Sequence, residues 1–190
     1  MARRGIDRGA VLALAGDLAD AQGVEAVTVA RVAAGLGIRA PSLYNHVPGR
    51  EALVQGVAAG AIGELTARLA AAAVGRGGED ALLAAAHAYR AYARAHPGRY
   101  AAMQRAPASG DPEVLAAGER AVDVLSRILG AWQLKGDDAV HAVRALRSAL
   151  HGFSDLERVG SFQLAVDPDE SFERLVRGFA AGLTSSLATR

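Results

Sequence analysis

The sequence contains no cysteine and only one lysine, Lys135, and aromatic residues make up 5% of it. Without cysteine the chain has no disulfide bonds, no thiol nucleophile and no thiolate metal ligands. No stretch of about 18 apolar residues is free of charge and glycine, so we expect no membrane-spanning helix. A secretory leader is not expected either, because Arg3 and Arg4 are not followed by a long apolar run. These absences predict a soluble cytoplasmic protein.

The sequence patterns that mark enzymes are missing as well. The five histidines show neither an HExxH nor a His-x-His spacing, so they predict no metal site. No GxSxG motif is present, and His151 is too close in sequence to Ser154 and Asp155 to form a catalytic triad with them. We therefore expect no catalytic residue, no metal ion and no cofactor. Turnover of a small molecule in a substrate screen would contradict this expectation.

Hydrophobic residues make up 51% of the chain and recur with a helical period, whereas no segment alternates as a strand would. The expected fold class is all-α. The pattern predicts helices at residues 7–22, 29–36, 40–46, 50–73, 79–95, 98–105, 113–134, 137–159 and 169–187, with loops at 107–112 and 160–168. The GRGG stretch at 75–78 is the clearest linker. We predict an N-terminal domain at residues 1–49, a connecting helix at about 50–73 and a C-terminal domain at 74–190.

Charge is distributed unevenly along the chain. Residues 1–50 contain six arginines against four acidic residues, whereas the remainder contains fifteen basic residues against sixteen acidic ones. This asymmetry slightly favours an anion-binding N-terminal domain. We attribute the general preference for arginine over lysine to genome composition.

The stretch GIRAPSLYNHV, residues 37–47, follows a short predicted helix. Thr28 can cap that helix through its hydroxyl, and Gly37 allows the chain to reverse between two short helices. The apolar residues that can hold the two helices together are Val32, Leu36, Ile38, Leu43 and Val47. This arrangement is typical of a helix-turn-helix.

The same packing leaves polar residues of the second short helix facing outward. Pro41 suits its first turn, where the missing N–H costs little. Ser42 and Tyr44 can donate to phosphate, and Arg39 can bind a guanine edge or a phosphate. Arg50, at the start of the next helix, is placed to hold another phosphate. The alternative is that Tyr44 and His46 are ordinary surface residues of an amphipathic helix.

Residues 28–54, TVARVAAGLGIRAPSLYNHVPGREALV, closely resemble the DNA-binding head of the TetR family of bacterial transcriptional regulators. The resemblance covers residues 7–55 by motif, and the whole chain by length and helical plan. It implies a dimer that binds double-stranded DNA and a small-molecule effector. The DNA-binding residues that it implies are Thr28, Arg31, Arg39, Ala40, Pro41, Ser42, Tyr44, His46 and Arg50.

Several of these residues carry individual expectations. Thr28 is expected to meet a backbone phosphate, although capping of its helix is an equally good explanation. Arg39 stands where the family often has a hydroxyl residue that caps the helix, and it is the expected base reader. Arg31 stands where glutamate would complete a capping box, so it is expected to be a further phosphate contact. Arg50 replaces the usual lysine and should still bind phosphate, with a different geometry.

The last two predicted helices have wide apolar faces, which the resemblance assigns to a dimeric four-helix bundle. Gly178 and Gly182, one helical turn apart, permit a close approach of helices, but they can equally reflect packing within the chain. Residues 145–164 and 167–179 also resemble the WHG type of TetR C-terminal domain, with Leu150 where that name would place tryptophan.

A sensor also needs a cavity, and the scarce aromatic, histidine and methionine residues beyond the linker are candidates for its lining. The candidate ligand-binding residues are His87, Tyr89, Tyr92, Met103, Trp132, His151 and Phe153, with Tyr100 and Phe162 as further possibilities. The alternative for each is ordinary core packing. The function expected from the whole sequence is a repressor released from a pseudo-palindromic operator by a small-molecule effector. The alternatives are a transcriptional activator and an architectural DNA-binding protein without an effector.

Overall fold

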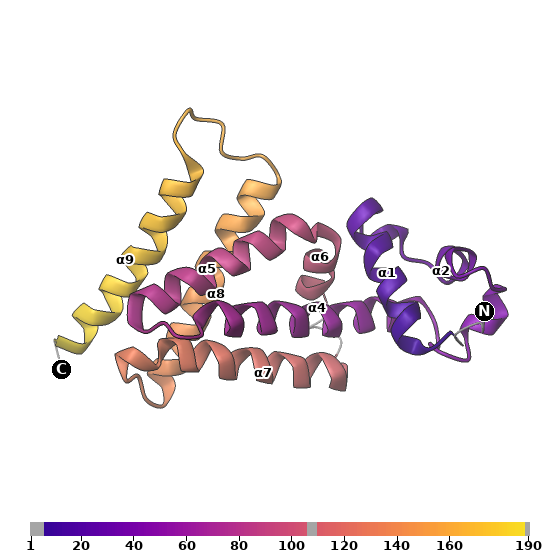
Figure 1. Ribbon diagram of the computed structural model, residues 1–190, viewed down its shortest axis with the longest axis horizontal. Coiled ribbons are helices and arrows are strands. Elements are labelled where there is room, and N and C mark those ends of the chain that lie inside the picture. Colours follow the sequence, from indigo (N-terminus) through magenta and orange to yellow (C-terminus); the bar gives the residue numbers. More distant parts are fainter. Residues whose placement is uncertain (1–5, 106–109, 189–190) are drawn as a thin grey trace. The chain divides into compact units, whose positions relative to one another are not determined.

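The computed structural model describes residues 6–105 and 110–188, and every regular element within these ranges is a helix (Figure 1). The elements are α1 (Arg8–Gln22), η1 (Val24–Ala26), α2 (Val29–Gly35), α3 (Ala40–Leu43), α4 (Arg50–Ala73), α5 (Gly78–Ala95), α6 (Pro97–Arg105), α7 (Pro112–Ile128), η3 (Leu129–Trp132), α8 (Asp137–Arg158) and α9 (Pro168–Ala188). This confirms the all-α fold class. In the described part of the chain, none of the helices is long and apolar enough to cross a membrane.

The helix boundaries expected from the sequence agree with the structure to within a few residues, with two differences. The α-helical part of α3 ends at Leu43, and turns replace the predicted helix up to residue 46. α7 ends at Ile128, and the chain continues as the 3-10 helix η3 instead of as α-helix. The predicted loop at 107–112 lies partly outside the described residues.

The chain divides into two compact units, of which the first comprises residues Met1–Gly63 and His96–Glu119, and the second comprises Glu64–Ala95 and Arg120–Arg190. The first unit therefore contains α6, which the sequence had assigned to the C-terminal domain. The predicted domain boundary at residue 49 stays a prediction, since a compact unit and an independently folding domain are different properties.

The core of the first unit forms where α1, α2, α3 and the first half of α4 bring their apolar faces together. Its fully buried members include Val11, Ala15, Val32, Leu43, Val47 and Leu53. α6 docks on the end of α1 through Asp20, whose Oδ1 accepts hydrogen bonds from the backbone N–H groups of Gly98 (3.0 Å) and Arg99 (2.8 Å). The carboxylate thus satisfies orphan donors at the start of α6.

The second unit is built around α5, which packs against α8, α9 and η3. Phe172 of α9 is fully buried, and Trp132 of η3 donates its indole N–H to Thr184 of α9 over 3.1 Å. The connection between α8 and α9, residues 159–167, extends beyond the ends of these two helices (Figure 1). The helices of this unit therefore pack through α5, while the α8–α9 connection stays at the surface.

Candidate nucleic-acid interface

The helix pair α2–α3 begins at a side-chain cap. The Oγ1 atom of Thr28 accepts a hydrogen bond from the backbone N–H of Arg31 over 3.3 Å, as expected for an N-cap residue. The chain leaves α2 through Gly37, whose φ of 69° lies in the left-handed region that glycine adopts without strain. The structure thus confirms the capping role of Thr28; its contact with phosphate stays a prediction.

α3 is held in place by its apolar residues, as the sequence predicted. Leu43 and Val47 are fully buried, and Val32 of α2 is buried in the same cluster. Leu36 and Ile38 are partly buried against it. Because these residues anchor one side of α3, its opposite side must face solvent.

That outer side presents several of the predicted DNA-binding residues together. Arg39, Pro41, Ser42 and Tyr44 are exposed, and 56% of the Tyr44 surface is accessible. Ala40 and His46, which are also predicted DNA-binding residues, are half-buried. The result is a compact polar surface of a hydroxyl, a phenol and a guanidinium around one short helix.

Arg39 occupies the N-cap position of α3 without forming a side-chain cap. Its guanidinium group makes no hydrogen bond or ion pair with any residue that the structure describes. The side chain therefore keeps its full set of donors for an external partner. Such a fork of donors matches a phosphate or the O6 and N7 atoms of guanine.

Arg50 and Arg31, in contrast, have partners inside the first unit. The Nε atom of Arg50 donates to the Val27 carbonyl over 3.0 Å, and its Nη2 atom lies 2.8 Å from a carboxylate oxygen of Glu25. Arg31 donates to the side chain of Gln22. A phosphate that binds Arg50 or Arg31 would have to share the guanidinium group with these internal partners. The phosphate contacts of both arginines stay predictions.

Glu25 has a role that sequence reasoning did not identify. Its carboxylate pairs with Arg50 at the start of α4 and with Arg105 at the end of α6. The hydrogen bond and the charge of Arg105, together with Arg50, hold the pKa of Glu25 below its usual range. No local pattern could have revealed this cluster, because Arg105 is 80 residues away in sequence.

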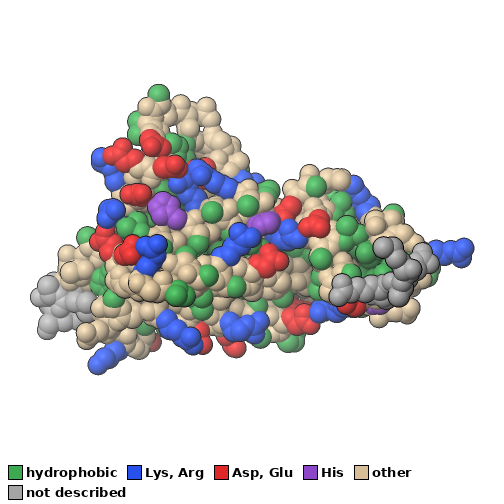
Figure 2. Space-filling model, in the orientation of Figure 1, with side chains coloured by type: hydrophobic (Ala, Val, Ile, Leu, Met, Phe, Trp, Pro, Cys, Tyr) green, Lys and Arg blue, Asp and Glu red, His purple; other side chains and the backbone are tan. Residues whose placement is uncertain are grey.

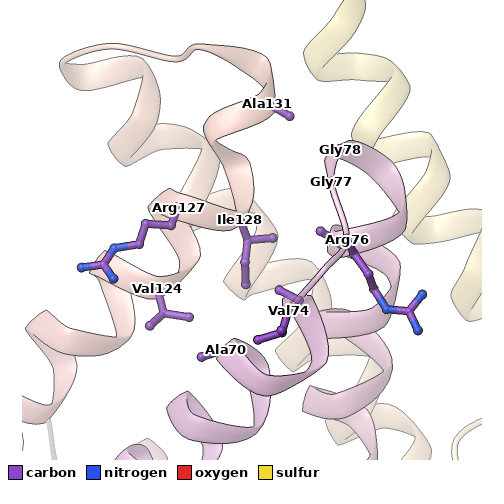
Figure 3. Close-up of a pocket in the computed structure, with 11 residues that line it drawn as sticks. Ala70, Val74, Arg76, Gly77, Gly78, Val124, Arg127, Ile128 and Ala131 are labelled. Carbon is purple, nitrogen blue, oxygen red and sulfur yellow. The ribbon is translucent and has the colours of Figure 1, made fainter.

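The second unit contains a hollow between the end of α4, the turn into α5 and the end of α7 (Figure 3). Its volume is about 350 Å³, within the usual range of small-molecule sites. Its lining is mostly small and apolar and consists of Ala70, Ala73, Val74, Arg76, Gly77, Gly78, Ala81, Val124, Arg127, Ile128 and Ala131. The side chains of Arg76 and Arg127 point away from the hollow on opposite sides (Figure 3).

None of the seven predicted ligand-binding residues lines this hollow. Met103 is buried in the first unit, as is Tyr100. In the second unit, the Tyr92 hydroxyl donates to Glu64 over 3.1 Å, and Trp132 is held by Thr184. Tyr89 is buried, and His151 is half-buried and has a partner of its own.

The remaining candidates, His87 and Phe153, belong to an aromatic cluster in the second unit. The centroid of the Phe153 ring lies 4.8 Å from that of Phe162 and 5.0 Å from that of Phe172, and the His87 centroid lies 5.5 Å from that of Phe172. The Nε2 atom of His87 is also 3.6 Å from a carboxylate oxygen of Glu173. The structure therefore distributes the seven residues over several packing contacts, and their role in ligand binding stays a prediction. Within the described residues, no group of three or more His, Asp or Glu side chains could hold a metal ion.

The geometry of the first unit agrees with comparisons to known proteins. Residues 11–57 match the family model for bacterial regulatory proteins of the tetR family. Residues 82–179 match the model for the tetracyclin repressor-like C-terminal domain. Together the two matches cover most of the chain.

Two transcriptional regulators of the helix-turn-helix type are similar to most of this chain. The uncharacterized regulator Rv0681 of Mycobacterium tuberculosis is 39% identical over 165 residues, which span 86% of this chain and 75% of that protein. The uncharacterized regulator YobS of Bacillus subtilis is 31% identical over 182 residues, which span 95% of this chain and 94% of that protein. Both similarities extend well beyond the helix-turn-helix.

Solved structures show the same fold. A protein of unknown function from Rhodococcus sp. RHA1 superposes with a TM-score of 0.80 at 25% identity, over 95% of this chain and 96% of that one. A variant of TetR from Acinetobacter baumannii in complex with minocycline superposes with a TM-score of 0.73 at 20% identity, over 96% of this chain and 99% of that one.

Proposed function

The chain belongs to the TetR family of bacterial transcriptional regulators, and on this premise we propose that it is a dimeric repressor released from its operator by a small molecule. The observation that carries the proposal is the exposed surface of α3, where Arg39, Ser42 and Tyr44 face solvent while Leu43 anchors the helix. A helix so presented fits the major groove. Arg39 reads a base, and Thr28, Ser42 and Tyr44 hold the phosphate backbone.

Dimerisation follows from the small contact area of one head. A single α3 reaches too few bases and phosphates for high affinity, whereas a two-fold dimer doubles them and reads a pseudo-palindrome. We assign the dimer interface to α8 and α9. A Cβ atom added to Gly178 or Gly182 of α9 would meet nothing within 4 Å, so packing within the chain does not require glycine at either position.

The exposed face of α8 supports the same assignment. Residues at helical spacing form an exposed or half-buried stripe: His141, Ala145, Ser148, Gly152, Leu156 and Val159. In an antiparallel pair of α8 helices that sets Val159 opposite the partner's His141, Ser148 meets the partner's Gly152 and Ala145 lies next to the partner's Leu156. The same register places Arg144 beside the partner's Asp155, which also pairs with Arg158 of its own chain, whereas a parallel pair would oppose Arg144 to its own copy.

The hollow in the second unit is the site we assign to the effector. It is lined by the last turn of α4, and the same helix begins at Arg50, whose guanidinium holds the segment before α2. A molecule that binds better when α4 is displaced favours the arrangement that cannot hold DNA. The separation of the two heads is then the quantity that changes.

Selection of operator DNA tests the proposal directly. Purified protein is mixed with fragmented genomic DNA at moderate salt, and the retained fragments are sequenced. We expect an enriched pseudo-palindrome with half-sites one helical turn, about 34–36 Å, or a multiple of it apart. Retention that is salt-sensitive but without a common sequence would favour the alternative of an architectural DNA-binding protein. Reporter expression from the selected operator then separates a repressor from an activator.

A further inference from the structure

The connection between α8 and α9 is unusually apolar for a surface segment. Val159, Phe162, Leu164 and Val166 are exposed, and 83% of the Leu164 surface and 62% of the Val166 surface are accessible. Figure 2 shows this connection at the top of the view, with no charged side chain at its tip. Exposed apolar residues scattered singly are ordinary, but a cluster in one short segment indicates a surface that another molecule covers.

The connection has an internal structure that turns these residues outward. The backbone N–H of Ser161 donates to the Leu156 carbonyl over 2.9 Å, and that of Val166 donates to the Leu164 carbonyl over 2.8 Å. The Phe162 ring packs on Phe153 of α8, with 4.8 Å between the centroids. The first half of the segment is therefore held against its own α8 at Leu156 and Phe153, while Leu164 and Val166 stay exposed.

The position of the connection relative to the α8 stripe indicates what covers it. Leu156 and Val159 of the stripe are exposed, and Val159 is also the first residue of the connection, so the connection begins where the proposed dimer interface ends. In the antiparallel pair, Val159 lies opposite the partner's His141. The residues that follow Val159 therefore reach the segment at and just before the start of the partner's α8, where Val140 is exposed.

Charge complementarity points to the same place. Asp167 closes the connection, is exposed and forms no ion pair with any described residue. Lys135, the only lysine in the chain, is exposed just before α8, and it too has no ion pair in the part of the chain that the structure describes. The antiparallel arrangement brings the partner's Lys135 to the end of the connection that carries Asp167.

We propose that the α8–α9 connection of each protomer is a strap that covers the segment 134–140 of a second copy of this chain. Leu164 and Val166 bury their side chains there, and Asp167 pairs with the partner's Lys135. The proposal rests on the proposed dimer and adds to it a contact outside the helical bundle. Two straps per dimer, related by the two-fold axis, would also fix the angle between the protomers.

The dimer dissociation constant tests the strap. In sedimentation experiments on the full chain, we expect Leu164→Ser combined with Val166→Ser to raise the constant by roughly tenfold or more. Leu115→Ser is the matched control, because Leu115 is an exposed leucine on α7 (52% accessible) outside the strap. An unchanged constant in the double variant, with a dimeric wild type, would overturn the strap and leave the dimer intact. A wild type that stays monomeric at all concentrations would overturn the dimer and the strap together.

The absence of cysteine allows a second test that does not depend on stability. Val140 and Leu164 lie near opposite ends of α8, whose 22 residues span about 33 Å, so a short bis-maleimide cannot join them within one chain. The variant with Val140→Cys and Leu164→Cys should give a covalent dimer, whereas Leu164→Cys alone should not. A covalent dimer from the single variant, or none from the double variant, contradicts the strap. Loss of binding to anionic lipid vesicles on Leu164→Ser, without any change in dimerisation, would assign the connection to a membrane surface instead.

Discussion

The guanidinium group of Arg90 on α5 and the carboxylate of Glu157 on α8 form a two-pronged ion pair away from solvent. Nε of Arg90 donates to Oε2 of Glu157 over 2.9 Å, and Nη2 donates to Oε1. Only 4% of the Arg90 side chain and 14% of the Glu157 side chain are accessible. Asp169 at the start of α9 lies 2.8 Å from the same Nη2 atom. This one arginine therefore links α5, α8 and α9.

We expect Arg90→Ala to destabilise the protein by roughly 3–5 kcal/mol, because it leaves a buried carboxylate without its main partner. The substitution also removes the contacts of the guanidinium with the rings of Phe153 and Phe172. Arg174→Ala is the control, since 79% of the Arg174 side chain is accessible and its pair with Glu170 should contribute less than about 1 kcal/mol. If urea denaturation gave equal losses of unfolding free energy for the two variants, the buried pair would contribute no more than the exposed one.

The same pair should make stability depend on acid pH. The hydrogen bond from Arg90, helped by Arg94 and against the effect of burial, lowers the pKa of Glu157 from 4.5 to about 2. Since the folded state has the lower pKa, the stabilisation is complete above about pH 4.5 and is lost as the pH falls toward 2. Denaturation midpoints measured across this range should fall less steeply for Glu157→Gln than for the wild type. If the midpoints of the two proteins fell equally steeply with pH, the acid dependence would not come from Glu157.

The helices and the helix-turn-helix were predictable because their signals are local. Periodicity marks α4 and α8 over many turns, and the cap at Thr28 and the turn at Gly37 are readable within a few residues. The apolar set around Leu43 could also be derived, since it follows from spacing alone. The end of α3 was harder to place, because a four-residue helix has less than two turns of pattern.

Contacts between distant residues could not be derived in this way. Asp20 and Arg99 are 79 residues apart, and nothing near either one indicates that α6 docks on α1. Arg50 was interpreted from its neighbours as a phosphate ligand, and its bonds to the Val27 carbonyl depend on how the segment before α2 folds. The hollow could not be derived from the sequence either, because its lining of mostly small residues comes from two separate segments of the chain.

The docking of α6 on α1 leads to a further prediction. A Cβ atom added at Gly98 would lie 1.9 Å from the carbonyl oxygen of Ala19, and a backbone atom cannot move aside as a flexible side chain can. Gly98→Ala should therefore destabilise the protein by about 1–3 kcal/mol or more. Gly118→Ala on α7 is the matched control, because a Cβ there meets nothing within 4 Å and alanine favours helix. A Gly98→Ala protein as stable as the control would contradict the close approach.

Arg39 gives the prediction closest to the proposed function. Because its guanidinium is unpaired within the described residues, Arg39→Ala should leave the stability of the fold nearly unchanged. It should relax the base preference at one operator position at a cost of about 1–3 kcal/mol, if the contact is bidentate. Arg127→Ala, in the other unit and 80% accessible, should change neither affinity nor preference. Operator selection repeated with both variants measures the difference, and an unaltered preference in Arg39→Ala would remove this residue from base reading.

The sequence predicts that Arg50 binds phosphate, whereas the structure shows it bonded to the Val27 carbonyl and to Glu25. Its substitution can distinguish these two roles. If it binds phosphate, Arg50→Ala should weaken all DNA sequences alike and reduce the slope of log affinity against log salt by about one. Its bonds to the Val27 carbonyl and to Glu25 predict a loss of stability as well. Glu25→Gln serves as the control, because it weakens the internal pair while keeping the arginine. A reduced salt slope in Arg50→Ala with an unchanged slope in Glu25→Gln would establish the phosphate contact. Equal slopes in both variants would assign Arg50 to holding the segment before α2, and DNA binding would then be impaired only through that segment.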